Sequence, residues 1–202
     1  MKKTAINIHH TASYAENDMA EQFDSVNEGH KARWKGATKS KMGFYGGYHY
    51  IVERNGAVQQ FRGEEETGAH NNVGLMNYKA IGVCFAGNMS RQNLTEAQIR
   101  AGVKLIKDIQ KRHDIPDENV TPHRASKSTQ CPGNNFADPV WKFLQEQFEK
   151  LDEKEPDIVK WHKKNKIIEK WNKPATPDEL KLGWTIYKAL KQFKENPIKF
   201  DL

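Results

Sequence analysis

The chain has 202 residues, of which 37% are hydrophobic and 10% aromatic, enough apolar material for one globular domain with a small appendage. Two cysteines exclude a disulfide framework, and no run approaches the roughly 18 apolar residues of a membrane span. The net charge of +6 favours anionic partners such as nucleic acid or bacterial wall polymers, although surplus lysine that only maintains solubility is an equal explanation.

The N-terminal segment predicts a strand followed by a helix. Residues 4–8 alternate and are rich in β-branched side chains, so we expect a strand that delivers His9 at its C-terminal end. Lys2 and Lys3 resemble the start of a signal peptide, but the apolar run after them is too short. We therefore expect synthesis in a cytoplasm without an export signal. Residues 17–29 carry apolar side chains at helical spacing, with a glycine as the stop.

A hairpin and a central strand are expected next. Asn55 and Gly56 separate two β-rich runs, residues 48–53 and 58–61, and an Asn-Gly pair is a strong signal for a hairpin turn. Residues 80–85 form a near-continuous apolar run, which is typical of a strand buried on both faces.

The second half of the chain adds two helices and a short strand. A helix is expected over residues 95–112, where Thr95 and Gln98 form a capping box ahead of aliphatic residues at helical spacing. Residues 120–122 predict a strand, and Asp138 followed by proline predicts the start of another helix. Strands that alternate with helices indicate an α/β fold, in which a central mixed β-sheet is flanked by helices.

The composition changes at residues 152–156, a charged stretch broken by proline. We place a domain boundary there, between a main domain at residues 1–150 and a small α-helical appendage at residues 156–202. Two helices, at residues 156–166 and 177–194, are expected in this appendage.

His123 and Cys131 are the most informative pair of residues. They lie eight positions apart in one loop, and an imidazole and a thiolate can supply two ligands to a zinc ion. His9, at the end of the first strand, is a third candidate. Three such ligands leave the fourth tetrahedral position open, as in catalytic rather than structural zinc sites. His10 has the opposite strand parity, so only one of the two neighbours can face the metal.

Five short motifs follow one another along the chain. They are residues 8–12 (Ile-His-His-Thr-Ala), 47–52 (Gly-Tyr-His-Tyr-Ile-Val), 67–71 (Thr-Gly-Ala-His-Asn), 81–88 and 121–133. In this order they resemble the zinc-dependent N-acetylmuramoyl-L-alanine amidases of the type 2 family, which includes phage lysozyme-like amidases and the peptidoglycan recognition proteins. The resemblance covers roughly residues 4–148.

The resemblance implies that one Zn²⁺ is held by His9, His123 and Cys131. It also implies hydrolysis of the amide between N-acetylmuramic acid and L-alanine in bacterial peptidoglycan, with water and then the substrate carbonyl at the open position. Tyr48 matches the catalytic tyrosine of the family, whose phenol assists proton handling or donates to the oxyanion. Thr129 stands two residues before the cysteine, where phage lysozyme-like members often carry lysine and other members use threonine.

The identity of the second catalytic helper stays open between Thr129 and Lys127. A hydroxyl can hydrogen-bond an oxyanion without adding charge, whereas Lys127 would bring a charge, although loop lysines are usually solvated. His70 and Asn71 are expected to line the substrate groove, with a plain surface histidine as the alternative for His70.

Three functions are compatible with the resemblance. The first is a lytic amidase, such as a phage endolysin, acting as a monomer on peptidoglycan with neither a nucleic-acid partner nor membrane insertion. The second is a peptidoglycan receptor without turnover, but non-catalytic relatives typically lose the cysteine ligand and this chain retains Cys131. The third is a regulator that binds RNA polymerase, as in one phage branch of the family. Residues 156–202 are either a wall-targeting element or an extension packed on the main domain.

Overall fold

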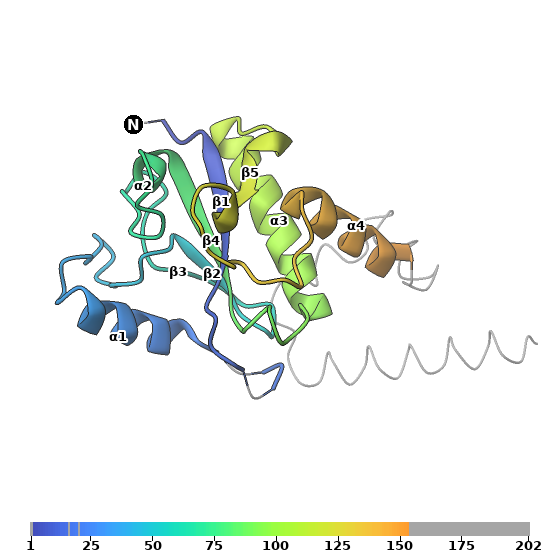
Figure 1. Cartoon of the computed structure of the whole chain (residues 1–202), viewed down its shortest axis with the longest axis horizontal. Coiled ribbons are helices and arrows are strands. Elements are labelled where there is room, and N and C mark those ends of the chain that lie inside the picture. Colours follow the sequence, from blue (N-terminus) through green and yellow to red (C-terminus); the bar gives the residue numbers. More distant parts are fainter. Residues whose placement is uncertain (1, 16, 20, 154–202) are drawn as a thin grey trace, which may run out of the picture. The chain divides into compact units, whose positions relative to one another are not determined.

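A five-stranded mixed β-sheet, in the order β3-β2-β4-β1-β5, forms the centre of the computed structural model (Figure 1). The structure describes residues 2–15, 17–19 and 21–153. The strands are β1 (Ala5–His10), β2 (Tyr50–Val52), β3 (Val58–Gln60), β4 (Ala80–Phe85) and β5 (Val120–Pro122). The helices are α1 (Phe23–Arg33), α2 (Met76–Lys79), α3 (Glu96–His113) and α4 (Val140–Glu153), with single 3₁₀ turns at η1 (Asp117–Asn119) and η2 (His123–Ala125).

The central strand is β4, whose six residues are all buried. It pairs in parallel with β1 on one side and with β2 on the other, and β5 is parallel to β1. β3 is antiparallel to β2, as the Asn-Gly turn predicts. The register sets His9 opposite Cys84 and Ile8 opposite Pro122. The predicted α/β class and mixed sheet are confirmed.

Helices cover both faces of the sheet, and each face has its own core (Figure 1). α3 and α4 pack on one face through buried aliphatic side chains that include Ile99, Val103 and Leu144. α1 covers the opposite face, where the ring of Phe23 stacks on that of Phe61 with centroids 4.2 Å apart. Since successive strand residues point to opposite faces, each strand contributes to both layers.

The predicted capping box at the start of α3 is confirmed. Oγ1 of Thr95 accepts a hydrogen bond from the backbone N of Gln98 at 3.0 Å, and Oε1 of Gln98 accepts one from the backbone N of Thr95 at 3.3 Å. The buried side-chain amide of Gln98 also donates to the carbonyl oxygens of Val52 and Ala86. The cap therefore ties α3 directly to β2 and to the end of β4.

The helix predicted at residues 17–29 has the wrong bounds, because α1 runs from Phe23 to Arg33 and contains the glycine expected as its stop. Met19, assigned to the apolar face, is 73% exposed. The carboxylate of Glu53 accepts a hydrogen bond from the backbone N of Gln22 at 2.9 Å and so lies at the positive end of α1. A helix start held by a side chain from another strand region cannot be read from local spacing.

The helix predicted after Asp138 is confirmed as α4, which begins at Val140. The expected appendage helices at residues 156–166 and 177–194 lie outside the described residues. Within the described part of the chain, none of the helices combines the length and apolar character needed to cross a membrane.

Candidate metal centre

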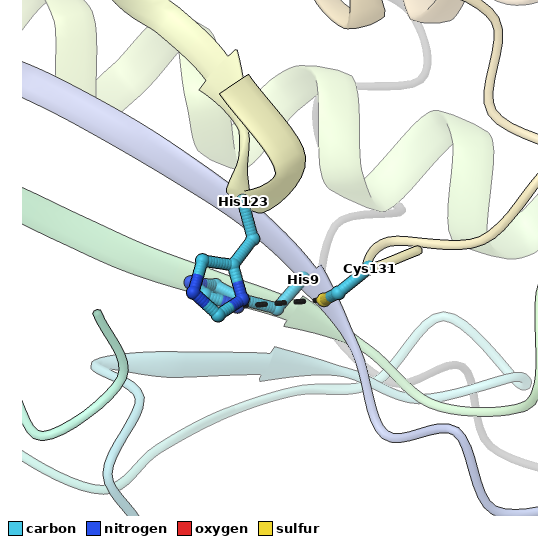
Figure 2. A group of neighbouring side chains, drawn as sticks. All are labelled: His9, His123 and Cys131. Atoms are coloured by element: carbon cyan, nitrogen blue, oxygen red, sulfur yellow. Dashed lines mark hydrogen bonds between the residues drawn. The ribbon is translucent and has the colours of Figure 1, made fainter. Parts of the chain in front are cut away.

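The fold brings together the three residues expected to bind zinc. His9 is the penultimate residue of β1, His123 directly follows β5, and Cys131 lies in the loop after η2 (Figure 2). One potential ligand atom from each lies within 4.8 Å of the others. Nδ1 of His9 is 3.6 Å from Sγ of Cys131, and the two imidazole centroids are 4.5 Å apart. Because β1 and β5 are parallel neighbours, both histidines lie at the same end of the sheet, where these strands end.

The loop that presents Cys131 is held by Arg124. The backbone N of Arg124 donates to the carbonyl oxygen of Cys131 at 2.9 Å. Its guanidinium donates to the carbonyl oxygens of Gly133 and Phe136, at 3.0 and 2.6 Å, and pairs with the carboxylate of Asp138. These contacts fix both ends of the cysteine loop, a function that sequence reasoning did not assign to this arginine.

The donor set fits a zinc ion. Nε2 of His123 is buried and, among the described residues, has no hydrogen-bond partner. Burial lowers the pKa of His9 and of His123, which keeps both imidazoles in the neutral form that binds metals. Burial also raises the pKa of the Cys131 thiol to about 11, so a bound cation must displace its proton. Two neutral nitrogens and one thiolate are a typical catalytic zinc set.

Tyr48 lies directly beside the ligand set. Its ring centroid is 5.1 Å from that of His9 and 5.4 Å from that of His30 on α1. Burial raises the pKa of Tyr48 well above its usual value, and the buried thiol of Cys84 adds to this shift. The phenol therefore stays protonated at neutral pH and can donate a hydrogen bond into the site.

The metal centre opens into a cleft of about 730 Å³. The other four predicted site residues, His70, Asn71, Lys127 and Thr129, all line it. Oγ1 of Thr129 accepts a hydrogen bond from the backbone N of Cys131 at 3.3 Å, whereas Nζ of Lys127 reaches Oδ1 of an asparagine on the rim at 3.0 Å. Of the two candidate helpers, Thr129 therefore contacts Cys131, whereas the ammonium of Lys127 contacts the rim.

Asn71 and His70 line the cleft but are largely buried. Asn71 is 1% exposed and donates its amide to Oδ1 of Asn7 and Oγ of Ser126, at 2.8 and 2.6 Å. His70 is 9% exposed, and its Nδ1 lies 3.0 Å from Nε2 of His9. His10 faces the opposite side of β1, as its parity predicts, and its Nδ1 accepts a hydrogen bond from the backbone N of Met89 at 3.0 Å.

Among the described residues, the charged side chains that line the cleft are all positive. Arg33, Arg91 and Lys127 line it, and none of the described residues lining it carries a carboxylate. Sequence reasoning missed the two arginines. Arg33 occupies the last turn of α1, beyond the predicted end of that helix, and Arg91 lies in the loop after β4, where no motif marks it.

Comparison with known proteins agrees with this geometry. The family model described as N-acetylmuramoyl-L-alanine amidase matches residues 1–134. Peptidoglycan-recognition protein SC2 of Drosophila melanogaster is 38% identical over 91 residues, which make up 45% of this chain and 48% of that protein. The chain therefore spans about half the length of this curated relative.

Two solved structures share the fold. N-acetylmuramoyl-L-alanine amidase LysC from Clostridium intestinale URNW has a TM-score of 0.56 and 25% identity, over 70% of this chain and 84% of that chain. The Ph2119 endolysin from a Thermus scotoductus bacteriophage has a TM-score of 0.56 and 17% identity, over 73% of this chain and 86% of that chain. The second likeness is one of fold alone.

Proposed function

The chain belongs to the N-acetylmuramoyl-L-alanine amidase family, and from this premise we propose that it is a zinc-dependent hydrolase of bacterial peptidoglycan. Its reaction would be cleavage of the amide between N-acetylmuramic acid and L-alanine. The convergence of His9, His123 and Cys131 at one cleft is the observation that carries the proposal. The solved structure of LysC, an N-acetylmuramoyl-L-alanine amidase with the same fold, supports this proposal.

The three ligand residues would hold one Zn²⁺ and leave a coordination position for the reaction. When bound, zinc supplies the Lewis acidity that makes water a nucleophile near neutral pH and polarises an amide carbonyl. The protein contributes the neutral state of both imidazoles, because burial disfavours their protonation. Arg124 contributes the fixed position of the cysteine loop.

Tyr48 would donate its phenolic proton toward the oxygen that gains negative charge in the tetrahedral transition state. Its place beside His9 and its raised pKa support this role, since a protonated phenol is a donor. Thr129 would add a second donor from the ligand loop, as its hydroxyl lies next to the backbone of Cys131. Lys127, on the rim, is better placed to bind substrate than to assist the chemistry.

The cationic cleft supports an anionic substrate. A peptide stem that ends in free carboxylates would meet Arg33, Arg91 and Lys127, and no carboxylate among the described lining residues would oppose it. Removing one such charge is expected to raise KM for the stem peptide more than it lowers kcat.

A receptor without turnover is the second candidate, because the matched relatives include peptidoglycan-recognition proteins. The retained Cys131 favours catalysis, since it completes the donor set. The likeness to the solved endolysin amidase LysCS from Clostridium intestinale URNW, at 25% identity, also supports an endolysin role, with residues 156–202 as a wall-targeting element. Deleting those residues should then preserve hydrolysis of soluble muropeptides and abolish sedimentation with cell walls, whereas loss of hydrolysis would favour an extension that packs on the main domain.

Mass spectrometry of digested peptidoglycan tests the reaction itself. We expect free stem peptides that begin with L-alanine, together with peptide-free glycan chains. Products that retain the lactyl–alanine bond, such as shortened peptides or cut glycans, would contradict the proposed amidase activity. Complete absence of cleavage, with retained binding to cell walls, would favour the receptor.

A further inference from the structure

His70 is engaged through both of its ring nitrogens. Its Nδ1 lies 3.0 Å from Nε2 of His9, and its Nε2 lies 3.4 Å from the carbonyl oxygen of Ala80. Its ring meets that of His9 nearly edge-on, at 81° with centroids 5.0 Å apart, and that of His49 in the same way at 74° and 5.6 Å. A substrate-binding histidine would direct a nitrogen into the cleft, whereas both nitrogens here bond to the protein.

These two contacts fix the direction of the hydrogen bond between the rings. A carbonyl oxygen only accepts, so Nε2 of His70 must carry the proton that it shares with Ala80. In a neutral imidazole that carries its proton on Nε2, the other ring nitrogen is an acceptor, so Nδ1 of His70 accepts. The donor is then Nε2–H of His9. This tautomer leaves the lone pair of His9 on Nδ1, the nitrogen that faces Sγ of Cys131.

Two glycines leave the space that the ring of His70 occupies. A Cβ atom at Gly82, within β4, would come 2.7 Å from Cδ2 of His70, and one at Gly68 would come 2.4 Å from the same atom. A glycine inside a strand weakens that strand, and it often marks a close approach by another group. The backbone N of His70 is also held, by Oδ1 of Asn77 at 2.9 Å.

We propose that His70 is a positioning residue that accepts a hydrogen bond from His9 and thereby fixes the tautomer and orientation in which Nδ1 of His9 binds zinc. This inference rests on the proposed metal site and deepens it. Histidine ligands usually donate their second N–H to a carboxylate, a carbonyl oxygen or water, and loss of that partner typically weakens metal binding 10- to 100-fold. A neutral imidazole orients His9 without placing a further negative charge near the Cys131 thiolate.

Zinc affinity in two variants separates this role from simple packing. His70→Phe keeps a ring of similar size but removes the acceptor, so we expect its zinc Kd, measured by competition with a chromophoric chelator, to rise about 10- to 100-fold. His70→Asn keeps an acceptor oxygen near the position of Nδ1 and should stay within about threefold of wild type. A packing role predicts the reverse order, because phenylalanine fills the space and asparagine does not.

His113→Phe is the matched control, since His113 bonds Glu64 at the far end of α3 and should leave zinc affinity unchanged. Wild-type affinity in His70→Phe, or equal losses in both His70 variants, would overturn the proposal. In the metal-free wild-type protein, side-chain ¹⁵N shifts should report the Nε2–H tautomer of His9. The Nδ1–H tautomer would overturn the proposal without any variant. Neither measurement uses substrate, so a failure of the amidase activity is a separate result.

Discussion

The two faces of the central sheet are built from alternating residues of the same strands, yet their chemistry differs. Ile6 and Ile8 of β1 join the aliphatic core beneath α3 and α4. Asn7 and His9, which alternate with them, take part instead in side-chain hydrogen bonds with Asn71 and His70. One strand thus contributes to the hydrophobic core and, near its C-terminal end, to the candidate metal centre.

The difference teaches that stability and function are separable in this fold. The face that packs beneath α3 and α4, called the aliphatic face here, is stabilised by buried apolar volume. Its side chains can be exchanged for others as long as the core stays filled. The other face carries His9 and His70; together with the adjoining loop of His123 and Cys131 it is called the histidine face here. Each buried nitrogen on this face requires a specific partner, since an unpartnered polar atom is costly to bury. Among the described residues, the buried side-chain atoms without such a partner are Nε2 of His123, Oε1 of Glu53 and Nε1 of Trp141.

Replacing a ligand on the histidine face should give the largest functional effect. Cys131→Ala removes the thiolate of the donor set, so we expect loss of stoichiometric zinc and a fall in hydrolysis of about 10³-fold or more. The metal-free variant should unfold at the same temperature as metal-free wild type. Calorimetry and metal analysis on the same sample check both statements, and retained activity would break the assignment of Cys131.

Replacing a residue on the aliphatic face should reduce stability and leave zinc binding unchanged. Ile106, on α3, is fully buried, and Ile106→Ala should lower the free energy of unfolding by about 2–5 kcal/mol through lost burial and a cavity. Below its unfolding transition this variant should bind zinc as wild type does. Denaturant titration and a zinc competition assay measure the two quantities, and a parallel loss of zinc affinity would show that the faces are coupled.

Tyr48→Phe sharpens the comparison within the histidine face. The ring and its contact with His9 remain, but the donor is lost, so kcat should fall on the order of 10²-fold while zinc affinity is unchanged. Steady-state kinetics on a soluble muropeptide, paired with zinc titration, give this separation. Full activity would remove Tyr48 from the mechanism.

The smallest effect is expected at Glu64, remote from the ligand set. Burial would raise the pKa of Glu64, but hydrogen bonds from Arg112, His113 and Tyr50 outweigh it and hold that pKa at about 2. The pKa is depressed in the folded state, so this stabilisation is full above the unfolded value of 4.5 and is lost as pH falls toward 2. We expect about 1–2 kcal/mol, because Arg112 is half-exposed.

Acid titration of unfolding in the metal-free protein measures this contribution. Glu64→Gln should reduce stability at neutral pH and flatten the dependence between pH 4.5 and 2. An unchanged slope in Glu64→Gln would assign the acid sensitivity to other carboxyl groups.

The strands and the three candidate metal ligands, which the structure brings together, could be predicted from the sequence because both have local signatures. The apolar run of β4 and the spacing of His123 from Cys131 are visible without tertiary information. The start of α1 is not, because it depends on a hydrogen bond from Gln22 to the carboxylate of Glu53. The bond from His9 to His70 likewise joins residues far apart in the chain, so the motif that contains His70 indicated a site residue but not its contact.

The central claim is that the histidine face holds one zinc ion for hydrolysis. Titrating zinc into metal-free protein, while following release of stem peptides that begin with L-alanine, tests it most directly. We expect activity to be absent without metal and to rise linearly to a break at one equivalent of zinc. Full activity without metal, or one tightly bound zinc with no cleavage of any peptidoglycan tested, would contradict the claim.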